Sequence, residues 1–373
     1  MTFHVKQSSS PALSFLEQSI AELEARGELR SRSPATGNPA RSFCSNDYLG
    51  LSSLAAPLAS SGAGASRLVC GDRDVHVAVE QHAAAFVDQP QALAFSSGYA
   101  ANVGLLSALL DRHSFVVIDA LCHASIIDGV RLSRAHLSVA PHCDASAVAE
   151  RLEHADGRRA FVVTESYFSM DADSPDLTAL RTICDSFGAA LLVDEAHALG
   201  VLGPEGRGLC VQHGIRADAV VGTFGKAFGA GGAFVGGCPT LIAWLWNRAR
   251  SFVFSTGLSP VLAEAALAGM RRAAAEPWRR QRVLAASGEL RAGLAKLGLR
   301  TPGDGPIVPW LVGPNSEAVR IADALSDRGF LVRAIRPPSV PSGTARLRLT
   351  VTAAHDSSDV ERLVDAVASV LPR

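Results

Sequence analysis

The hydrophobic pattern of this chain divides it into three stretches. Apolar positions recur at helical spacing over residues 13–30, and a run rich in Ser, Pro and Gly then interrupts them. From about residue 75 to 240, short β-branched runs alternate with helical stretches, and a long helical stretch follows over roughly 261–297. The pattern predicts three parts: an N-terminal helix and linker (1–45), a large α/β domain (46–260) and a smaller α+β C-terminal domain (261–373).

Several of the β-branched runs end in a polar residue. These runs are residues 115–119, 161–165, 190–196 and 219–224. Strands of a parallel α/β sheet behave in this way, because their carboxyl ends deliver side chains to a crevice. The sequence therefore predicts an α/β fold with a mainly parallel sheet, and it places the functional residues at strand ends.

Composition excludes several classes of protein. With 48% hydrophobic and 19% charged residues over 373 positions, the chain resembles an ordinary globular enzyme. Its net charge of −1, without runs of like charge, argues against a nucleic-acid partner. The seven cysteines are scattered and never spaced as CxxC, so neither a disulfide framework nor a metal site is expected. No 18-residue apolar run or signal-peptide layout occurs, so we expect a cytoplasmic protein that does not insert into membranes.

Lysine is rare in this chain, which makes Lys226 informative. Lysine and arginine total 35, yet the lysines are only Lys6, Lys226 and Lys296. Lys226 lies within the apolar, Gly-rich run "VVGTFGKAFGAGGAFVGG". A charge there is costly unless it is used, and a deprotonated lysine can form a Schiff base with a carbonyl. The alternative is a stray surface lysine.

Three familiar motifs are absent. The P-loop fails because Ala227 follows Gly225-Lys226 and Val220 occupies the earlier glycine position. The dinucleotide fingerprint fails because "GAGASR" (62–67) ends in arginine, and "FSSG" (95–98) is not a nucleophile elbow. Nucleotide enzymes and serine hydrolases are therefore disfavoured.

A set of residues in the middle of the chain instead fits pyridoxal phosphate. Asp194 ends a strand-like run, His197 follows it, and Lys226 comes just after the next run. A buried carboxylate keeps the cofactor's pyridine nitrogen protonated, and a lysine holds the cofactor as a Schiff base. Gly98 and Tyr99 stand where a helix N-terminus would bind the phosphate. A helix-capping Asp194 and a core His197 remain the structural alternative.

Seven ordered segments resemble the α-oxoamine synthases, a family of fold-type-I pyridoxal-phosphate enzymes. The resemblance covers nearly the whole chain. The matching segments are "SNDYLGL" (45–51), "FSSGYAAN" (95–102), "HASIIDG" (123–129), "FSMDADS" (168–174), "VDEAHALG" (193–200), "TFGKAFG" (223–229) and "VPSGTARLRLTVTAAH" (340–355).

The resemblance implies roles for three catalytic residues. Lys226 would hold the cofactor and then act as the base that removes the substrate's Cα proton. Asp194 would face the pyridine nitrogen. His123 would stack on the cofactor ring and hydrogen-bond the acyl carbonyl of the substrate.

Further cofactor contacts also follow from the resemblance. Ser169 and His197 would touch the phenolic oxygen. Thr223 would bind the phosphate through its hydroxyl, and Gly98 and Tyr99 would bind it through their backbone amides.

The substrate contacts come from the same resemblance. Arg348 would hold a substrate carboxylate, and Ser339 falls where the family has a threonine near the substrate. Arg30 would bind the far carboxylate of the acyl chain. Asn46 and Thr256 are expected across the interface of a homodimer with shared active sites.

Within the family, residues 334–348 resemble the biotin-pathway member. That resemblance implies a decarboxylative condensation of L-alanine with a pimeloyl thioester, carried by coenzyme A or by an acyl-carrier protein. Another α-oxoamine synthase such as a glycine acetyltransferase, a pyridoxal-phosphate aminotransferase, or a catalytically idle cofactor-binding protein remain alternatives. Ala172 and Ala198 depart from the family, because glycine is common at both positions. We expect them to narrow the space around the backbone near the cofactor without abolishing the reaction.

Overall fold

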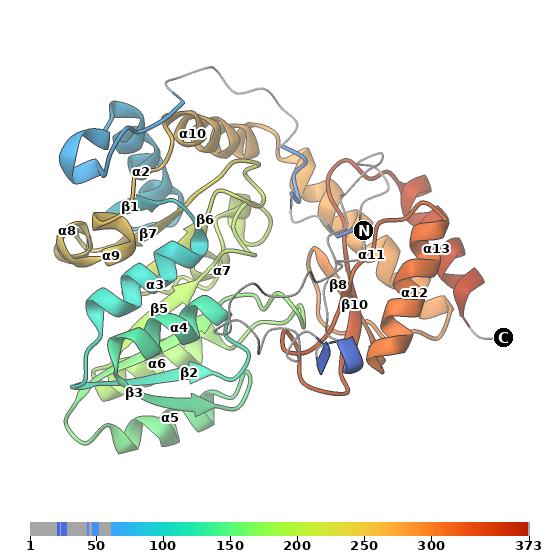
Figure 1. Ribbon diagram of the computed structural model, residues 1–373, viewed down its shortest axis with the longest axis horizontal. Coiled ribbons are helices and arrows are strands. Elements are labelled where there is room, and N and C mark those ends of the chain that lie inside the picture. The colour runs from blue at the N-terminus through green and yellow to red at the C-terminus, as the bar shows by residue number, and fades with distance from the viewer. Residues whose placement is uncertain (1–20, 23, 28–42, 45–46, 52–60, 372–373) are drawn as a thin grey trace. The chain divides into compact units, whose positions relative to one another are not determined.

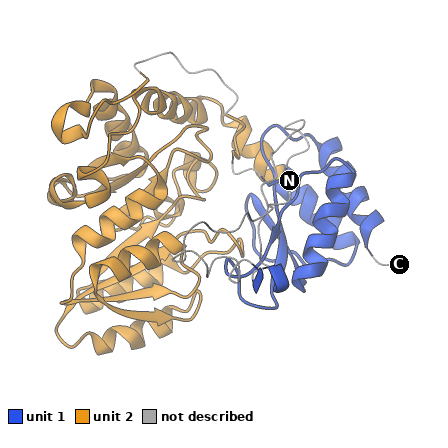
Figure 2. Cartoon of the chain, in the orientation of Figure 1, with its two compact units in different colours: residues 1–45, 286–373 blue, residues 46–285 orange. Residues whose placement is uncertain are grey.

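The chain forms two compact units, which Figure 2 colours separately. The larger unit comprises residues 46–285, and the smaller one combines residues 1–45 with 286–373. The computed structural model describes residues 21–22, 24–27, 43–44, 47–51 and 61–371.

The observed boundary at residue 285 differs from the predicted one at 260. Helix α10 (Pro260–Ala275) belongs to the larger unit, where it packs against α2 (Asp74–Phe86). It also approaches the loop after Lys226 closely, because a Cβ on Gly269 would lie 2.0 Å from the Phe228 carbonyl oxygen. A helical pattern shows where a helix begins, but not which core it packs on.

A seven-stranded sheet forms the centre of the larger unit (Figure 1). Its order is β1-β7-β6-β5-β4-β2-β3, and all strands run in one direction except β7. The mainly parallel sheet is therefore confirmed. The strands are β1 (Gln91–Phe95), β2 (Ser114–Asp119), β3 (His136–Ala140), β4 (Arg159–Glu165), β5 (Ala190–Asp194), β6 (Ala219–Thr223) and β7 (Ala233–Gly237).

Helices cover both faces of this sheet, as Figure 1 shows. Alternate residues of β2 and β4, such as Val116 and Val163, pack with α3, α4, α8 and α9 into one apolar core, while α2, α5 and α6 contact the sheet separately. The helices not yet given are η3 (Arg67–Gly71), α3 (Gly98–Leu109), α4 (Ala124–Ser133), α5 (Ala145–Leu152), η4 (Glu153–Ala155), α6 (Leu177–Phe187), η5 (Pro204–Gly206), α7 (Leu209–Gln212), α8 (Pro239–Arg248) and α9 (Arg250–Val253).

The four predicted strands of the larger unit are present, and each has one boundary shifted: β2 begins at Ser114 and β4 at Arg159, slightly before the predicted starts. The run 190–196 stops as a strand at Asp194, and the run 219–224 stops at Thr223. The sequence pattern missed β1, β3 and β7. β3 is an edge strand with mostly exposed side chains, so it lacks the apolar run that marks the buried strands.

The predicted long helix over 261–297 is two helices. α10 ends at Ala275 and α11 (Trp278–Lys296) begins after a break at Pro277. Proline lacks the N–H that an interior helical position donates, and it disfavours helical geometry at the residue before it. Glu276 accordingly leaves the helical region, with φ −117° and ψ 65°.

The smaller unit holds a three-stranded antiparallel sheet in the order β8-β10-β9. Its strands and remaining helices are β8 (Ile307–Gly313), α12 (Asn315–Asp327), β9 (Ala334–Ile335), β10 (Ala345–Thr350) and α13 (Ser357–Val370). Most of the predicted N-terminal helix lies outside the described residues, although residues 21–22 and 24–25 are helical. Within the described part of the chain, no helix is both long and apolar enough to span a membrane.

Candidate active site

Polar side chains stand at the carboxyl ends of three neighbouring strands of the large sheet. Glu165 ends β4, Asp194 ends β5 and Thr223 ends β6, and Glu165 pairs directly with Asp194 in the parallel ladder. Lys226 lies three residues beyond the end of β6. Because these strands are parallel, the four residues lie at the same end of the sheet, where the strands have their carboxyl ends. This end of the sheet therefore combines two carboxyl groups with an amine.

Asp194 is held in one orientation by two donors. Its side chain is buried, and Asn102 Nδ2 donates to Oδ2 at 2.7 Å while the Ala196 N–H donates to Oδ1 at 2.9 Å. Asn102 is also buried and comes from α3, 92 residues earlier in the chain. Both oxygens of the carboxylate are thus engaged from the protein side.

His123 caps the N-terminus of α4. Its Nδ1 accepts a hydrogen bond from the Ser125 N–H at 3.2 Å and lies 2.7 Å from Ser125 Oγ. Its own backbone N–H donates to Glu165 Oε1 at 2.7 Å. Burial lowers the pKa of His123, against the opposing effect of the Asp194 charge and with a further lowering by Lys226. The imidazole is therefore neutral near pH 7.

Lys226 is half-buried in the loop that joins β6 to β7. Gly200 gives this loop room, because a Cβ on Gly200 would lie only 2.5 Å from the Cβ of Ala227. Gly200 also has φ +84°, a region that favours glycine. The Gly229 N–H donates to the Lys226 carbonyl at 3.0 Å and closes a turn around the lysine.

Glu165 shares its surroundings with the other charged groups. Burial, reinforced by the neighbouring charge of Asp194, raises the pKa of Glu165 to about 8, although Lys226 acts in the opposite direction. Glu165 is thus mostly protonated at neutral pH, and its Oε1 still accepts the His123 N–H.

Three more predicted cofactor residues lie in the larger unit. His197 is buried, and its Nδ1 lies 2.8 Å from Tyr48 Oη. Thr223 is buried, and its hydroxyl donates to the Gly232 carbonyl at 3.1 Å. Ser169 is half-buried in the loop after β4.

The N-terminus of α3 supplies backbone amides. The helix begins at Gly98, and Ser97 caps it by accepting from the Ala100 N–H at 3.1 Å. A Cβ on Gly98 would meet nothing within 4 Å, so the space beside the first turn is open. Tyr99 is half exposed, and its hydroxyl donates to Asp128 Oδ2 at 2.7 Å. Such a helix N-terminus favours an anion.

The remaining predicted residues belong to other parts of the chain. Arg30 and Asn46 lie outside the described residues, and Thr256 is exposed in the larger unit. Ser339 and Arg348 belong to the smaller unit, where Ser339 is exposed and Arg348 is buried in the central strand β10. Their roles stay predictions.

A second histidine near the same end of the sheet has the opposite surroundings. His142 Nδ1 lies 2.8 Å from Asp119 Oδ1, and Nε2 lies 3.1 Å from Asp173 Oδ2. A carboxylate only accepts hydrogen bonds, so both ring nitrogens must carry a proton. Burial alone would lower the pKa of His142, but the bonds to Asp119 and Asp173 raise it to about 12. This bridge joins the end of β2, which carries Asp119, through the loop after β3, which carries His142, to the loop after β4, which carries Asp173.

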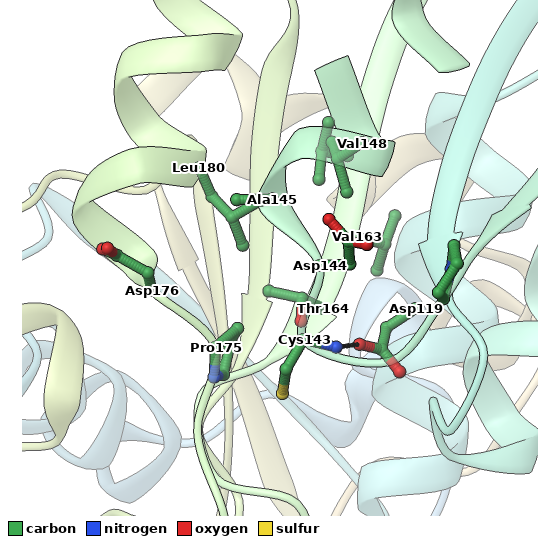
Figure 3. Close-up of a pocket in the computed structure, with 12 residues that line it drawn as sticks. Asp119, Cys143, Asp144, Ala145, Val148, Val163, Thr164, Pro175, Asp176 and Leu180 are labelled. Carbon is green, nitrogen blue, oxygen red and sulfur yellow. Dashed lines mark hydrogen bonds between the residues drawn. The ribbon is translucent and has the colours of Figure 1, made fainter. Parts of the chain in front are cut away.

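Asp119 of this bridge also lines a small pocket, shown in Figure 3. The Cys143 N–H donates to Asp119 Oδ2 at 2.7 Å, the contact drawn there as a dashed line. The pocket has a volume of about 10 Å³, room for about one water molecule. It is a packing space between the sheet and α5 and α6, and it cannot hold a substrate.

The sequence analysis missed four residues that organise the site. Asn102 and Ser125 stand inside segments that it quoted, but each acts through a residue distant in sequence. Glu165 ends a predicted strand and was not selected, although the same rule selected Asp194. His142 gave no signal, because its partners lie 23 and 31 residues away.

Fold and site together define a fold-type-I pyridoxal-phosphate transferase. The chain belongs to the aminotransferase class I and II family, whose model matches residues 41–367. It is 45% identical to an 8-amino-7-oxononanoate synthase of Anaeromyxobacter dehalogenans over an alignment of 383 positions, gaps included, that covers 97% of this chain and 96% of the relative. The resemblance to the α-oxoamine synthases is thereby confirmed.

Solved structures agree with this assignment. A serine palmitoyltransferase solved with pyridoxal phosphate superposes with a TM-score of 0.89 at 26% identity, over 97% of this chain and 98% of that one. An 8-amino-7-oxononanoate synthase from Francisella tularensis gives a TM-score of 0.75 at 26% identity, over 89% and 98% of the two chains.

Proposed function

We propose that this chain condenses L-alanine with a pimeloyl thioester to give 8-amino-7-oxononanoate, carbon dioxide and the free thiol, a step of biotin biosynthesis. The observation that carries the proposal is the near full-length similarity to synthases of that name. The grouping of Asp194, Lys226 and His123 at one end of the sheet supports it.

The residues present fit pyridoxal phosphate. A twice-bonded carboxylate, a lysine and an open helix N-terminus all belong to the larger unit. Bound pyridoxal phosphate supplies an electron sink that stabilises negative charge at the alanine Cα. Asp194 would face its ring nitrogen and keep that nitrogen protonated. Gly98 and Tyr99 would donate backbone N–H groups to the phosphate, and Thr223 would add a hydroxyl.

Lys226 has two tasks in this proposal. It would hold the cofactor covalently as a Schiff base, and its freed Nζ would then serve as the base that takes the proton from the alanine Cα. His123 stacks on the cofactor ring and donates a hydrogen bond to the acyl carbonyl. Ser169 and His197 contact the phenolic oxygen.

The substrate carboxylates require cations. Arg348 grips the carboxylate of alanine with its bidentate guanidinium. Ser339 lies near the substrate, and Arg30 binds the distal carboxylate of the pimeloyl chain.

We further propose a cytoplasmic homodimer with shared active sites. Leu68, Val69 and Phe254 are large apolar side chains with exposed fractions of 40%, 76% and 73%, and Thr256 lies beside Phe254. Apolar surface of this kind marks contacts between chains. Asn46 and Thr256 would then serve the partner's site. The acyl group arrives on coenzyme A or on an acyl-carrier protein.

The deciding experiment incubates purified protein and pyridoxal phosphate with L-alanine and a panel of acyl thioesters, including pimeloyl-coenzyme A and pimeloyl carrier protein. Release of carbon dioxide together with the amino ketone supports the proposal. Amino-group transfer from alanine to a keto acid without decarboxylation would identify an aminotransferase instead, and inertness toward every pair would identify a cofactor-binding protein. Borohydride reduction and peptide mapping should find the cofactor on Lys226; a label on Lys296 would refute the attachment site.

A further inference from the structure

The hydrogen bonds around His123 determine which of its nitrogens carries the proton. The Ser125 backbone N–H can only donate, and it points at Nδ1 from 3.2 Å. Nδ1 must therefore be the unprotonated nitrogen of the neutral ring. The proton lies on Nε2.

The Ser125 hydroxyl is consistent with the same assignment. Asn102 Nδ2 donates to Ser125 Oγ at 3.0 Å, so one acceptor position of this oxygen is filled. With Nδ1 already unprotonated, the Ser125 O–H donates to it across the 2.7 Å between Oγ and His123 Nδ1. The same Asn102 amide group donates to Asp194 at 2.7 Å, which prevents the amide from turning over.

We propose that Ser125 and Asn102 are positioning residues that hold His123 as the neutral Nε2–H tautomer. Both side chains are buried, with exposed fractions of 0% and 3%, so no bulk water competes for these bonds. The tautomer itself does not depend on the proposed function, but its role in the reaction does. In that reaction the Nε2–H group always carries its proton and donates a hydrogen bond toward the acyl carbonyl oxygen. His123 acts as a hydrogen-bond donor and does not deliver a proton as an acid.

Burial, more than the neighbouring charges, keeps the His123 ring neutral. Burial lowers the pKa of the ring and Lys226 lowers it further, while Asp194 and Asp128 act in the opposite direction. Glu165 bonds the His123 backbone rather than its ring. The ring also caps the positive end of α4, which disfavours a second positive charge there.

Nitrogen-15 NMR of the cofactor-free protein, with labelled histidine, tests the assignment directly. The His123 resonances, assigned by their loss in His123→Gln, should show an unprotonated Nδ1 and a protonated Nε2 at pH 7. Ser125→Ala removes the hydroxyl but keeps the backbone N–H that faces Nδ1, so it should shift only part of the population toward the Nδ1–H tautomer and should raise the pKa of the ring. A protonated Nδ1 in the wild-type protein would overturn the proposal, and this reading does not depend on the folding of any variant.

Kinetics of the loaded enzyme separate positioning from general support of the structure. Ser125→Ala should lower kcat with the acyl thioester about tenfold, the effect of one hydrogen bond, while the alanine KM stays within about twofold. Asn102→Ala also removes a donor to Asp194 and should therefore lower kcat at least as much, while Ser125→Thr, which keeps the hydroxyl, should recover most of the rate. Ser107→Ala, a control on α3 whose hydroxyl bonds only its own helix, should change nothing. Unchanged nitrogen shifts and unchanged kcat in Ser125→Ala would overturn the proposal.

The two proposals fail in different ways. If no thioester is condensed with alanine, the proposed function fails while the tautomer measured without cofactor still stands. If condensation proceeds and Nδ1 carries the proton, only the positioning role fails.

Discussion

His123 and His142 lie in loops at the same end of one sheet, yet they differ in charge. The Nδ1 of His123 faces two donors from Ser125, and the ring stays neutral. Both nitrogens of His142 face carboxylates, and the ring stays protonated. Burial acts in the same direction on both rings, so burial does not explain the difference. The type of hydrogen-bonding partner decides whether a histidine here is a neutral ring or a cation that bridges two carboxylates.

The largest expected effect comes from a substitution in the hydrogen-bond network around His123. Asp194→Asn removes the carboxylate that Asn102 bonds and that we assign to the cofactor nitrogen. Loss of a buried charge-assisted partner costs roughly 2 to 5 kcal/mol, or roughly 30- to 5,000-fold in turnover at about 1.4 kcal/mol per tenfold. Steady-state condensation rates measure it. The nitrogen shifts of His142 serve as the control and should not move; wild-type turnover would refute the role of Asp194.

The next largest effect comes from removing the charge of His142. His142→Gln replaces an imidazolium between Asp119 and Asp173 with a neutral amide. Hydrogen bonds to charged groups are worth about 1.5 to 3 kcal/mol, and partial exposure of the ring places the expected loss of unfolding free energy in the lower half of that range. Urea unfolding measures it. The alanine KM should change little, so a steep rise in that KM with full stability would contradict the structural role.

A pH series sharpens the comparison. Folding raises the pKa of His142 from an ordinary value of about 6.5 to about 12. Its stabilisation is therefore complete below about pH 6.5 and declines as pH rises through the window up to about 12. The difference in unfolding free energy between wild type and His142→Gln should be larger at pH 6 than at pH 10. A difference that grows with pH would mean that His142 is neutral in the fold.

The smallest effect concerns the loop that His142 ties down. Ala172 has φ +60° and is fully buried, so Ala172→Gly should raise the unfolding free energy by about 1 kcal/mol. Ala198 lacks a positive φ, and the matched variant Ala198→Gly should lower it by a similar amount. Thermal unfolding of both variants measures the pair. The same sign in both would contradict this explanation.

Much of the fold and the centre of the site could be predicted from local patterns. Buried strands with polar ends gave Asp194, and the isolated Lys226 stood out because lysine is rare in this chain. What could not be predicted depends on residues that folding brings together. Asn102 reaches Asp194 across 92 positions, and His142 reaches Asp173 across 31. The break at Pro277 is different, because proline disfavours a helix interior and the break could therefore be predicted from the sequence.

The tight packing around the loop of Lys226 has a consequence for how the lysine moves. Gly200 on one side and Gly269 on the other leave no room for even one added carbon next to Ala227 and Phe228. The main chain just after the lysine is therefore closely packed from two directions, whereas Gly225 just before it has no neighbour closer than 3.6 Å to an added Cβ. A shift of the backbone after Lys226 would have to move two glycine-containing segments as well. If Lys226 carries the cofactor and then takes a proton, most of the movement of its amine would come from rotation about the four methylene groups of its own side chain.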